Sequence, residues 1–111
     1  MTRIVLYRDH QGRFTGFSVK GHSGYAPEGS DIVCAGISAL TVTCVNALES
    51  VAGVEPIVSG GEDGFLEAHL PSLLNEAQMH DAQVLFRALH QGLSDLADGY
   101  EKYIRLTTKT V

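Results

Sequence analysis

The sequence is poor in cysteine, in positive charge and in uninterrupted hydrophobic runs, and each shortage excludes a class of protein. Only two of its 111 residues are cysteine, and eight Lys and Arg stand against 13 Asp and Glu, which gives a net charge of −5. Electrostatic binding of nucleic acid needs clustered Lys and Arg, and the sequence contains no such cluster. We therefore expect no direct contact with nucleic acid, whereas a basic polypeptide remains a suitable partner.

The two cysteines, Cys34 and Cys44, do not make a disulfide framework. On one helix their separation spans nearly three turns, roughly 15 Å, whereas a disulfide requires Cα atoms within about 7 Å. The chain starts with a strand-like segment at residues 3–7, without the basic and apolar regions of a signal peptide. These observations predict a reducing cytoplasm as the compartment.

The longest apolar stretch runs from Val33 to Leu48 and is interrupted by four polar residues, Ser38, Thr41, Thr43 and Asn46. It is too short and too polar for a bilayer span, so we predict no membrane partner. We interpret residues 31–52 as a helix that is apolar on most sides and therefore central to the core, with Gly53 as its stop.

Strand patterns surround this helix. Residues 3–8 and 13–20 are rich in β-branched and aromatic types and predict a hairpin. Residues 56–59 and 65–70 predict a second hairpin around the glycine-rich segment 60–64.

A second helix and a last strand complete the pattern. Asn75, with Gln78 three residues later, predicts a helix cap, and apolar residues at helical spacing follow it: Ala82, Leu85, Phe86, Leu89, Leu93, Leu96 and Tyr100. Residues 103–108 supply the strand. The order ββαββαβ predicts a single α+β domain over residues 1–111, with a mostly antiparallel sheet packed on two long helices.

The residues that carry chemistry gather in residues 21–38, where a strand ends, a glycine-rich loop follows and a helix begins. His22 closes the strand and Cys34 falls in the first turn of the helix. If Asp31 or Ser30 is the N-cap, the Cys34 sulfur lies near free backbone N–H groups and the positive end of the helix dipole. That setting favours a thiolate nucleophile, and an imidazole beside it can move the proton. We predict Cys34 as nucleophile and His22 as its base.

Neighbouring residues are candidates for supporting roles. The backbone amides of Ala35 and Gly36 are candidates to stabilise a tetrahedral oxyanion. Asp31 either caps the helix or orients His22 as the third member of a triad. Ser38, one helical turn beyond the nucleophile, hydrogen-bonds either within the site or back to its own helix.

The loop between the two catalytic candidates is either ordinary turn sequence or a mobile lid. Its members are Gly24, Tyr25, Pro27 and Gly29. We favour the lid because the segment separates His22 from Cys34 and active-site loops commonly order over a bound substrate. In this interpretation Tyr25 offers an apolar face to the substrate.

Each of these residues also has a structural interpretation. A cysteine in an apolar helix is usually a buried hydrophobe, which is what we predict for Cys44. A zinc site needs three or four convergent ligands, and only His22, Cys34 and Asp31 fall near one another in this pattern. We therefore predict neither a metal nor another cofactor.

The motif at residues 21–38 resembles that of a known family. It reads G-H-x-G-Y-A-x-x-G-x-D-I-V-C-A-x-x-S, with a hairpin before it and Val45-Asn46-Ala47-Leu48-Glu49 after it, and is similar to the bacterial ribosomal-processing cysteine proteases of the Prp family. The resemblance covers essentially the whole chain. It implies a homodimeric cytoplasmic endopeptidase that removes the short N-terminal extension of a large-subunit ribosomal protein.

The resemblance also assigns site residues. His22 and Cys34 match the catalytic dyad, Asp31 and Ser38 match accompanying motif positions, and the loop between them matches a substrate-gating segment. Two other functions remain open: a non-catalytic ribosome-assembly or peptide-binding module, and a thiol redox sensor. The absence of a resolving cysteine within reach counts against the sensor.

Overall fold

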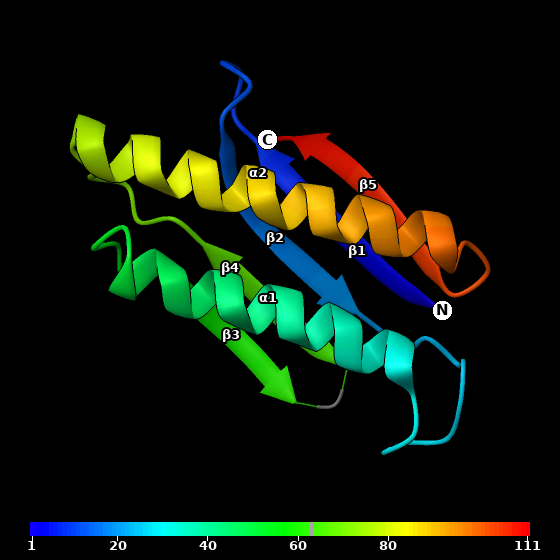
Figure 1. Cartoon of the computed structure of the whole chain (residues 1–111). Helices are drawn as coiled ribbons and strands as arrows, with labels where there is room; N and C mark the ends of the chain where they lie inside the picture. The colour runs from blue at the N-terminus through cyan, green and yellow to red at the C-terminus, as the bar shows by residue number, and fades with distance from the viewer. Residues whose placement is uncertain (63) are drawn as a thin grey trace.

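The computed structural model describes residues 1–62 and 64–111, and it shows two helices packed on one face of a five-stranded sheet (Figure 1). In chain order the elements are β1 (Thr2–Arg8), β2 (Phe14–Lys20), α1 (Ile32–Ser50), β3 (Ile57–Glu62), β4 (Phe65–His69), α2 (Glu76–Gly99) and β5 (Ile104–Thr110). The predicted order ββαββαβ and the α+β class are confirmed. Asp63, which belongs to the predicted turn at 60–64, lies outside the described residues.

Three antiparallel pairings and one parallel pairing build the sheet, in the order β3-β4-β2-β1-β5. Both predicted hairpins are present. β5 returns after α2 and pairs parallel with β1, with Ile4 beside Leu106. β2 is therefore held by neighbours on both sides, β1 and β4, which fixes the position at which the chain leaves the sheet towards His22.

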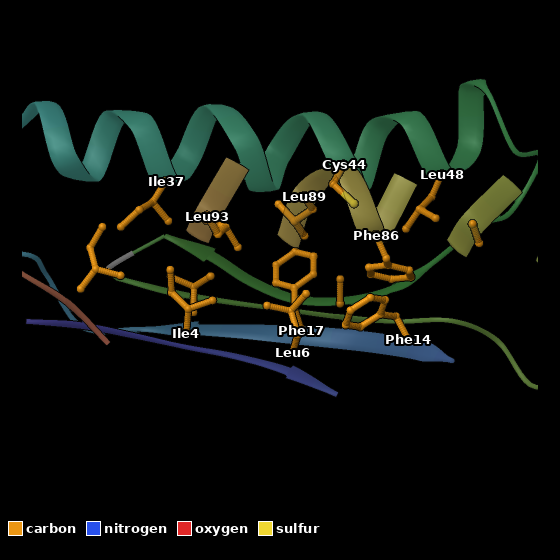
Figure 2. Close-up of a cluster of buried hydrophobic side chains, with 14 of the residues drawn as sticks. Ile4, Leu6, Phe14, Phe17, Ile37, Cys44, Leu48, Phe86, Leu89 and Leu93 are labelled. Atoms are coloured by element: carbon orange, nitrogen blue, oxygen red, sulfur yellow. The ribbon is translucent and has the colours of Figure 1, made fainter. Parts of the chain in front are cut away.

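The core lies between the helices and the sheet, because the strands present alternate side chains to the helices. Figure 2 shows the contributors: Ile4, Leu6, Phe14 and Phe17 from the sheet, Ile37, Cys44 and Leu48 from α1, and Phe86, Leu89 and Leu93 from α2. The predicted cap of α2 is confirmed as a capping box. The Asn75 side chain accepts from the Gln78 N–H at 2.8 Å, and the Gln78 side chain accepts from the Asn75 N–H at 3.1 Å.

The sequence predicted that α1 is surrounded by the core, but the structure buries only one side of it. It buries one stripe, Val33, Ile37, Thr41, Cys44 and Leu48, while Ile32 and Val42 are 56% and 47% exposed. A two-layer fold leaves the outer side of each helix in solvent. By length and composition alone α1 is apolar enough to cross a membrane, contrary to the expectation that its polar residues exclude this. A core helix passes the same test, and the buried stripe of α1 packs on the sheet.

Gly16 marks a tight crossing between β2 and β4. A Cβ placed on it would lie 2.5 Å from the Ala68 carbonyl oxygen and 2.6 Å from Nδ1 of His69. Overpacking of this kind costs about 1–3 kcal/mol. We expect Gly16→Ala to lower the free energy of unfolding by that amount in urea titrations. Gly99→Ala is the control, because nothing lies within 4 Å of its added Cβ, and an equal loss in both variants would contradict the packing argument.

Candidate active site

His22 is positioned by the turn that ends β2. Gly21 has a φ of +88°, a conformation that glycine adopts without strain, and its N–H donates to the Gly64 carbonyl at 2.8 Å. The imidazole then lies against the β3–β4 hairpin. A Cβ on Gly64 would be 2.9 Å from Nε2 of His22, so the glycine leaves room for the ring in its present position.

Cys34 lies half-buried in the first turn of α1. Asp31 is the N-cap of this helix, and its Oδ1 accepts from the backbone N–H groups of Val33 and Cys34, both at 3.0 Å. The predicted capping role of Asp31 is confirmed. The cap holds the first turn in register and so fixes where the Cys34 sulfur sits.

Ser23 links the loop to this helix terminus, a role that the sequence analysis missed. Its buried hydroxyl donates to the Asp31 carboxylate and accepts from the Tyr25 N–H at 3.2 Å. Its own backbone N–H donates to Sγ of Cys34 at 3.4 Å. Ser23 directly follows His22, so its contacts connect the end of β2 to the helix cap Asp31 and to the Cys34 sulfur.

The carboxylate of Asp31 is held in its charged form by these contacts. Desolvation raises the pKa of Asp31, but hydrogen bonds from the Ser23 hydroxyl and the Cys34 backbone N–H outweigh it and lower the pKa from 3.8 to about 2. Within the described part of the chain the side chain of Asp31 accepts hydrogen bonds from Ser23, Val33 and Cys34, not from His22. These contacts fit Asp31 as the helix cap rather than as the third member of a catalytic triad.

Asp31→Asn keeps a capping oxygen and removes the charge, so it isolates the electrostatic part of this contact. A depressed carboxyl pKa contributes stability that is present above the unfolded-state pKa and is lost as pH falls towards the folded-state value. We expect the variant to unfold at a lower temperature than the native chain at pH 7, where the charged carboxylate contributes fully. Its melting temperature should then fall less than that of the native chain between pH 4 and pH 2.

Circular dichroism melts at a series of pH values measure both effects. Asp98→Asn, an exposed position on α2, serves as the matched control and should leave the pH profile unchanged. If the melting temperatures of Asp31→Asn and the native chain fell equally between pH 4 and pH 2, the stabilising role of the Asp31 charge would be contradicted.

A cavity of about 620 Å³ opens between the loop, the start of α1 and the β3–β4 hairpin, and both His22 and Cys34 line it. The structure thus brings the two predicted catalytic residues to one cavity. No hydrogen bond joins their side chains among the described residues. Catalytic hydrogen bonds are often long before substrate binds.

The loop residues divide into two groups. Gly24 and Gly29, with φ of +76° and +86°, line the cavity. Tyr25 instead packs edge-on against Tyr100 and Tyr103, with ring centroids 5.6 and 5.3 Å apart. The expectation that Tyr25 faces the substrate does not fit this arrangement, because its ring is used to anchor the loop at the junction of α2 and β5. Pro27 also lies outside the cavity lining.

The predicted oxyanion donors are not free in this structure. The Ala35 N–H donates to the Asp31 carbonyl at 3.0 Å, because the α1 hydrogen-bond pattern has already begun there. Gly36 is the next residue of α1, so its N–H also lies beyond the four amides, counted from the cap Asp31, that the start of a helix leaves without a helical partner. The prediction counted these two amides among the free ones, whereas they lie just after them. The backbone N–H that the structure directs at the Cys34 sulfur is that of Ser23.

The other candidates have simpler environments. Ser38 is exposed and lines the cavity, but its hydroxyl has no hydrogen bond among the described residues. Cys44 is free and buried in the core, where desolvation raises its thiol pKa to about 11. Among the residues that the structure describes, no group of three or more His, Cys, Asp or Glu is placed to hold a metal ion.

Comparisons with known proteins agree on one family. A sequence model of the family described as "Cysteine protease Prp" matches residues 1–105. The "Ribosomal processing cysteine protease Prp" of Bacillus subtilis is 31% identical over 112 residues, covering all of both chains. The protein of the same name from Staphylococcus aureus is 28% identical over 109 residues, covering 98% of this chain and all of its own.

A solved structure is similar over the same length. The crystal structure of an essential ribosomal processing protease Prp from S. aureus, in complex with a covalently linked product peptide, superposes with a TM-score of 0.87 at 25% identity. The match covers 98% of this chain and all of that one. The likeness therefore covers almost the whole length of both chains.

Proposed function

Since the chain belongs to the Prp family of cysteine proteases, we propose that it removes the short N-terminal extension of a large-subunit ribosomal protein, with Cys34 as nucleophile and His22 as general base. The observation that carries the residue assignment is the single cavity lined by both side chains. The relatives' description as ribosomal processing proteases supports the substrate. The likeness to a protease bound to a covalently linked product peptide supports a peptide ligand.

The reaction proceeds in two halves. His22 accepts the thiol proton, the Cys34 sulfur attacks the scissile carbonyl carbon, and a tetrahedral intermediate forms. His22 then protonates the leaving amine, which departs and leaves a thioester on Cys34. A water molecule, deprotonated by His22, then attacks the thioester and forms a second tetrahedral intermediate. This intermediate releases the carboxylic acid product and the Cys34 thiolate, which takes the proton back from His22.

The chain's own geometry assists the charged species in this sequence. Cys34 lies in the first turn of α1, at the positive end of the helix dipole, where negative charge is favoured. The Ser23 N–H lies 3.4 Å from the sulfur, within reach of the oxygen of a carbonyl bound there. We assign oxyanion stabilisation to this amide, a single such donor being worth about 3 kcal/mol of barrier.

The loop at residues 23–30 gates the cavity in this proposal. Gly24 and Gly29 give it two points where the backbone changes direction at little steric cost. Tyr25 holds its middle against Tyr100 and Tyr103. Entry of the peptide requires movement of the glycine-flanked part around this anchor.

We also infer a homodimer working in a reducing cytoplasm. Two free thiols fit that compartment. Exposed apolar side chains on α1 and the edge strand β3, among them Val42, Ile57 and Val58, supply surface that a second copy would cover. Sedimentation equilibrium at micromolar concentration tests the dimer, and a single monomeric species would contradict it.

The proposed function is tested by incubating the protein with a synthetic extended N-terminus of a large-subunit ribosomal protein. Mass spectrometry should detect the shortened peptide, and prior treatment with iodoacetamide should prevent its appearance. Such a reagent reaches Cys34 rather than Cys44, because the core thiol is buried and its raised pKa leaves almost no thiolate at pH 8. Cleavage that continues after full alkylation of Cys34 would overturn the proposal.

Gly64→Ala probes the position of the base without removing it. The added Cβ would meet the His22 ring at 2.9 and 3.0 Å and the Gly21 carbonyl oxygen at 3.0 Å. Both contacts displace His22 from its present position, and misplacement by about 1 Å costs on the order of 100-fold in rate. We expect kcat/KM to fall by about that factor. Gly53→Ala is the matched control, since its φ of +66° is close to the +68° of Gly64, nothing lies within 4 Å of its Cβ, and it is not among the cavity-lining residues. Equal losses in the two variants would assign the effect to backbone strain.

A further inference from the structure

The sheet face that the helices leave uncovered carries much of the chain's positive charge. Both helices lie on the other face (Figure 1), and side chains alternate between the two faces along each strand. Four of the eight Lys and Arg occupy positions on the uncovered face: Arg3, Lys20, Arg105 and Lys109. The uncovered face therefore carries half of the chain's Lys and Arg, together with the Glu67 carboxylate, which is paired with His69.

Three of these cations are direct neighbours across three strands. The register places Arg3 of β1 opposite Lys20 of β2 on one side and beside Arg105 of β5 on the other. All three are exposed. Adjacent strands lie about 4.8 Å apart, and like charges directly opposite one another destabilise a sheet. We call these three residues the basic row.

The basic row has no counterion within the described part of the chain. The ion pairs there use the carboxylates of Asp9, Glu67 and Asp81, each with a different cation. Three adjacent positive charges with no carboxylate partner among the described side chains create a positive potential at one end of the sheet. The basic row is therefore suited to bind an anion from outside the chain.

An aromatic ring and the catalytic cavity adjoin the basic row. Lys20 is opposite Phe65 of β4, and its Nζ lies 5.9 Å from the centre of that ring. Phe65 also lines the cavity. Cations that contact phosphates, next to an aromatic face on which a base stacks, are the combination that binds single-stranded nucleic acid.

We propose that the basic row binds the phosphate backbone of a single-stranded RNA that lies beside the mouth of the catalytic cavity. The binding of a phosphate chain follows from the row itself, whereas the choice of RNA rests on the proposed ribosomal substrate. The proposal replaces the expectation, drawn from the sequence, that the chain makes no direct contact with nucleic acid. Arg3, Lys20 and Arg105 are scattered in the sequence and become neighbours only through strand pairing.

Fluorescence anisotropy with a short labelled oligouridylate at several salt concentrations tests the proposal. Three phosphate contacts predict a slope of log K against log salt of about −2, since each contact on a single strand contributes about −0.7. Arg3→Ala should bring the slope to about −1.4 and weaken binding severalfold. Arg3→Glu should remove measurable binding at moderate salt, while thermal melts report that both variants remain folded.

Arg87→Ala, an exposed cation on α2, is the matched control and should leave affinity and slope unchanged. Equal losses in Arg3→Ala and Arg87→Ala, or no loss in either, would overturn the basic row as the site. Stronger binding of oligothymidylate or polyglutamate than of oligouridylate would overturn RNA as the ligand. Cleavage of the isolated peptide should be unaffected by Arg3→Ala, so failure of this proposal is distinguishable from failure of the proposed function.

Discussion

Replacing Cys34 by alanine is expected to stop peptide cleavage, with kcat lower by about 10⁴-fold or more. The methyl group left in place of the thiol has no lone pair with which to attack a carbonyl, so no thioester can form. Folding should be retained, because the position is half-buried at the start of α1 and alanine is a better helix former than cysteine. Mass spectrometry of the extended peptide measures the loss, and circular dichroism measures the fold.

Cys44→Ala is the matched control for this experiment. It removes the chain's other thiol, which is buried among core side chains (Figure 2), so we expect lower stability with cleavage retained at temperatures where the variant is folded. Cleavage by Cys34→Ala at the native rate would refute the assigned nucleophile. It would favour the alternative of a peptide-binding module in which the cysteine is structural.

Features set by neighbouring residues in the chain were the ones that the sequence predicted well. The capping box at Asn75 and the cap at Asp31 involve partners only two or three residues away, so the residue types alone indicate them. The hairpins follow from short strands around turn residues. Local patterns of this kind account for the element order and for the placement of His22 and Cys34 at a loop and a helix start.

Features set by tertiary arrangement were missed. The composition of α1 predicted an enclosed helix, but exposure depends on the number of layers around it, which the sequence of the helix does not encode. Ser23 carries no signal beyond its place next to His22, because its bonds to Asp31 and Cys34 depend on how the loop returns. The basic row depends on the pairing of β5 with β1, a contact between opposite ends of the chain.

The oxyanion prediction failed for a related reason. It relied on the rule that the first turn of a helix has free amides, and it counted that turn too far along the chain. With Asp31 as the cap, the Ala35 amide is already bonded within the helix. The donor near the sulfur comes instead from the loop, through Ser23, which only the folded arrangement reveals.

His22→Ala is expected to lower kcat/KM by about 10²- to 10⁴-fold, the usual contribution of a general base. The loss should fall on kcat more than on KM, because the imidazole acts on protons in the transition state rather than holding the peptide. The pH profile should also change, since the variant lacks the group to which we assign the proton transfers. Initial rates between pH 5 and pH 9 measure these effects.

The matched control for His22 is His80→Ala, an exposed histidine on α2, which should keep the native rate and pH profile. The alkylation rate of Cys34 supplies a second readout that requires no substrate. If His22 accepts the thiol proton, its removal should slow alkylation at neutral pH and leave the rate at high pH, where the thiol ionises unaided, nearly unchanged. An unchanged pH profile for both reactions in His22→Ala would mean that some other group takes the proton, and that His22 lines the cavity for structural reasons alone.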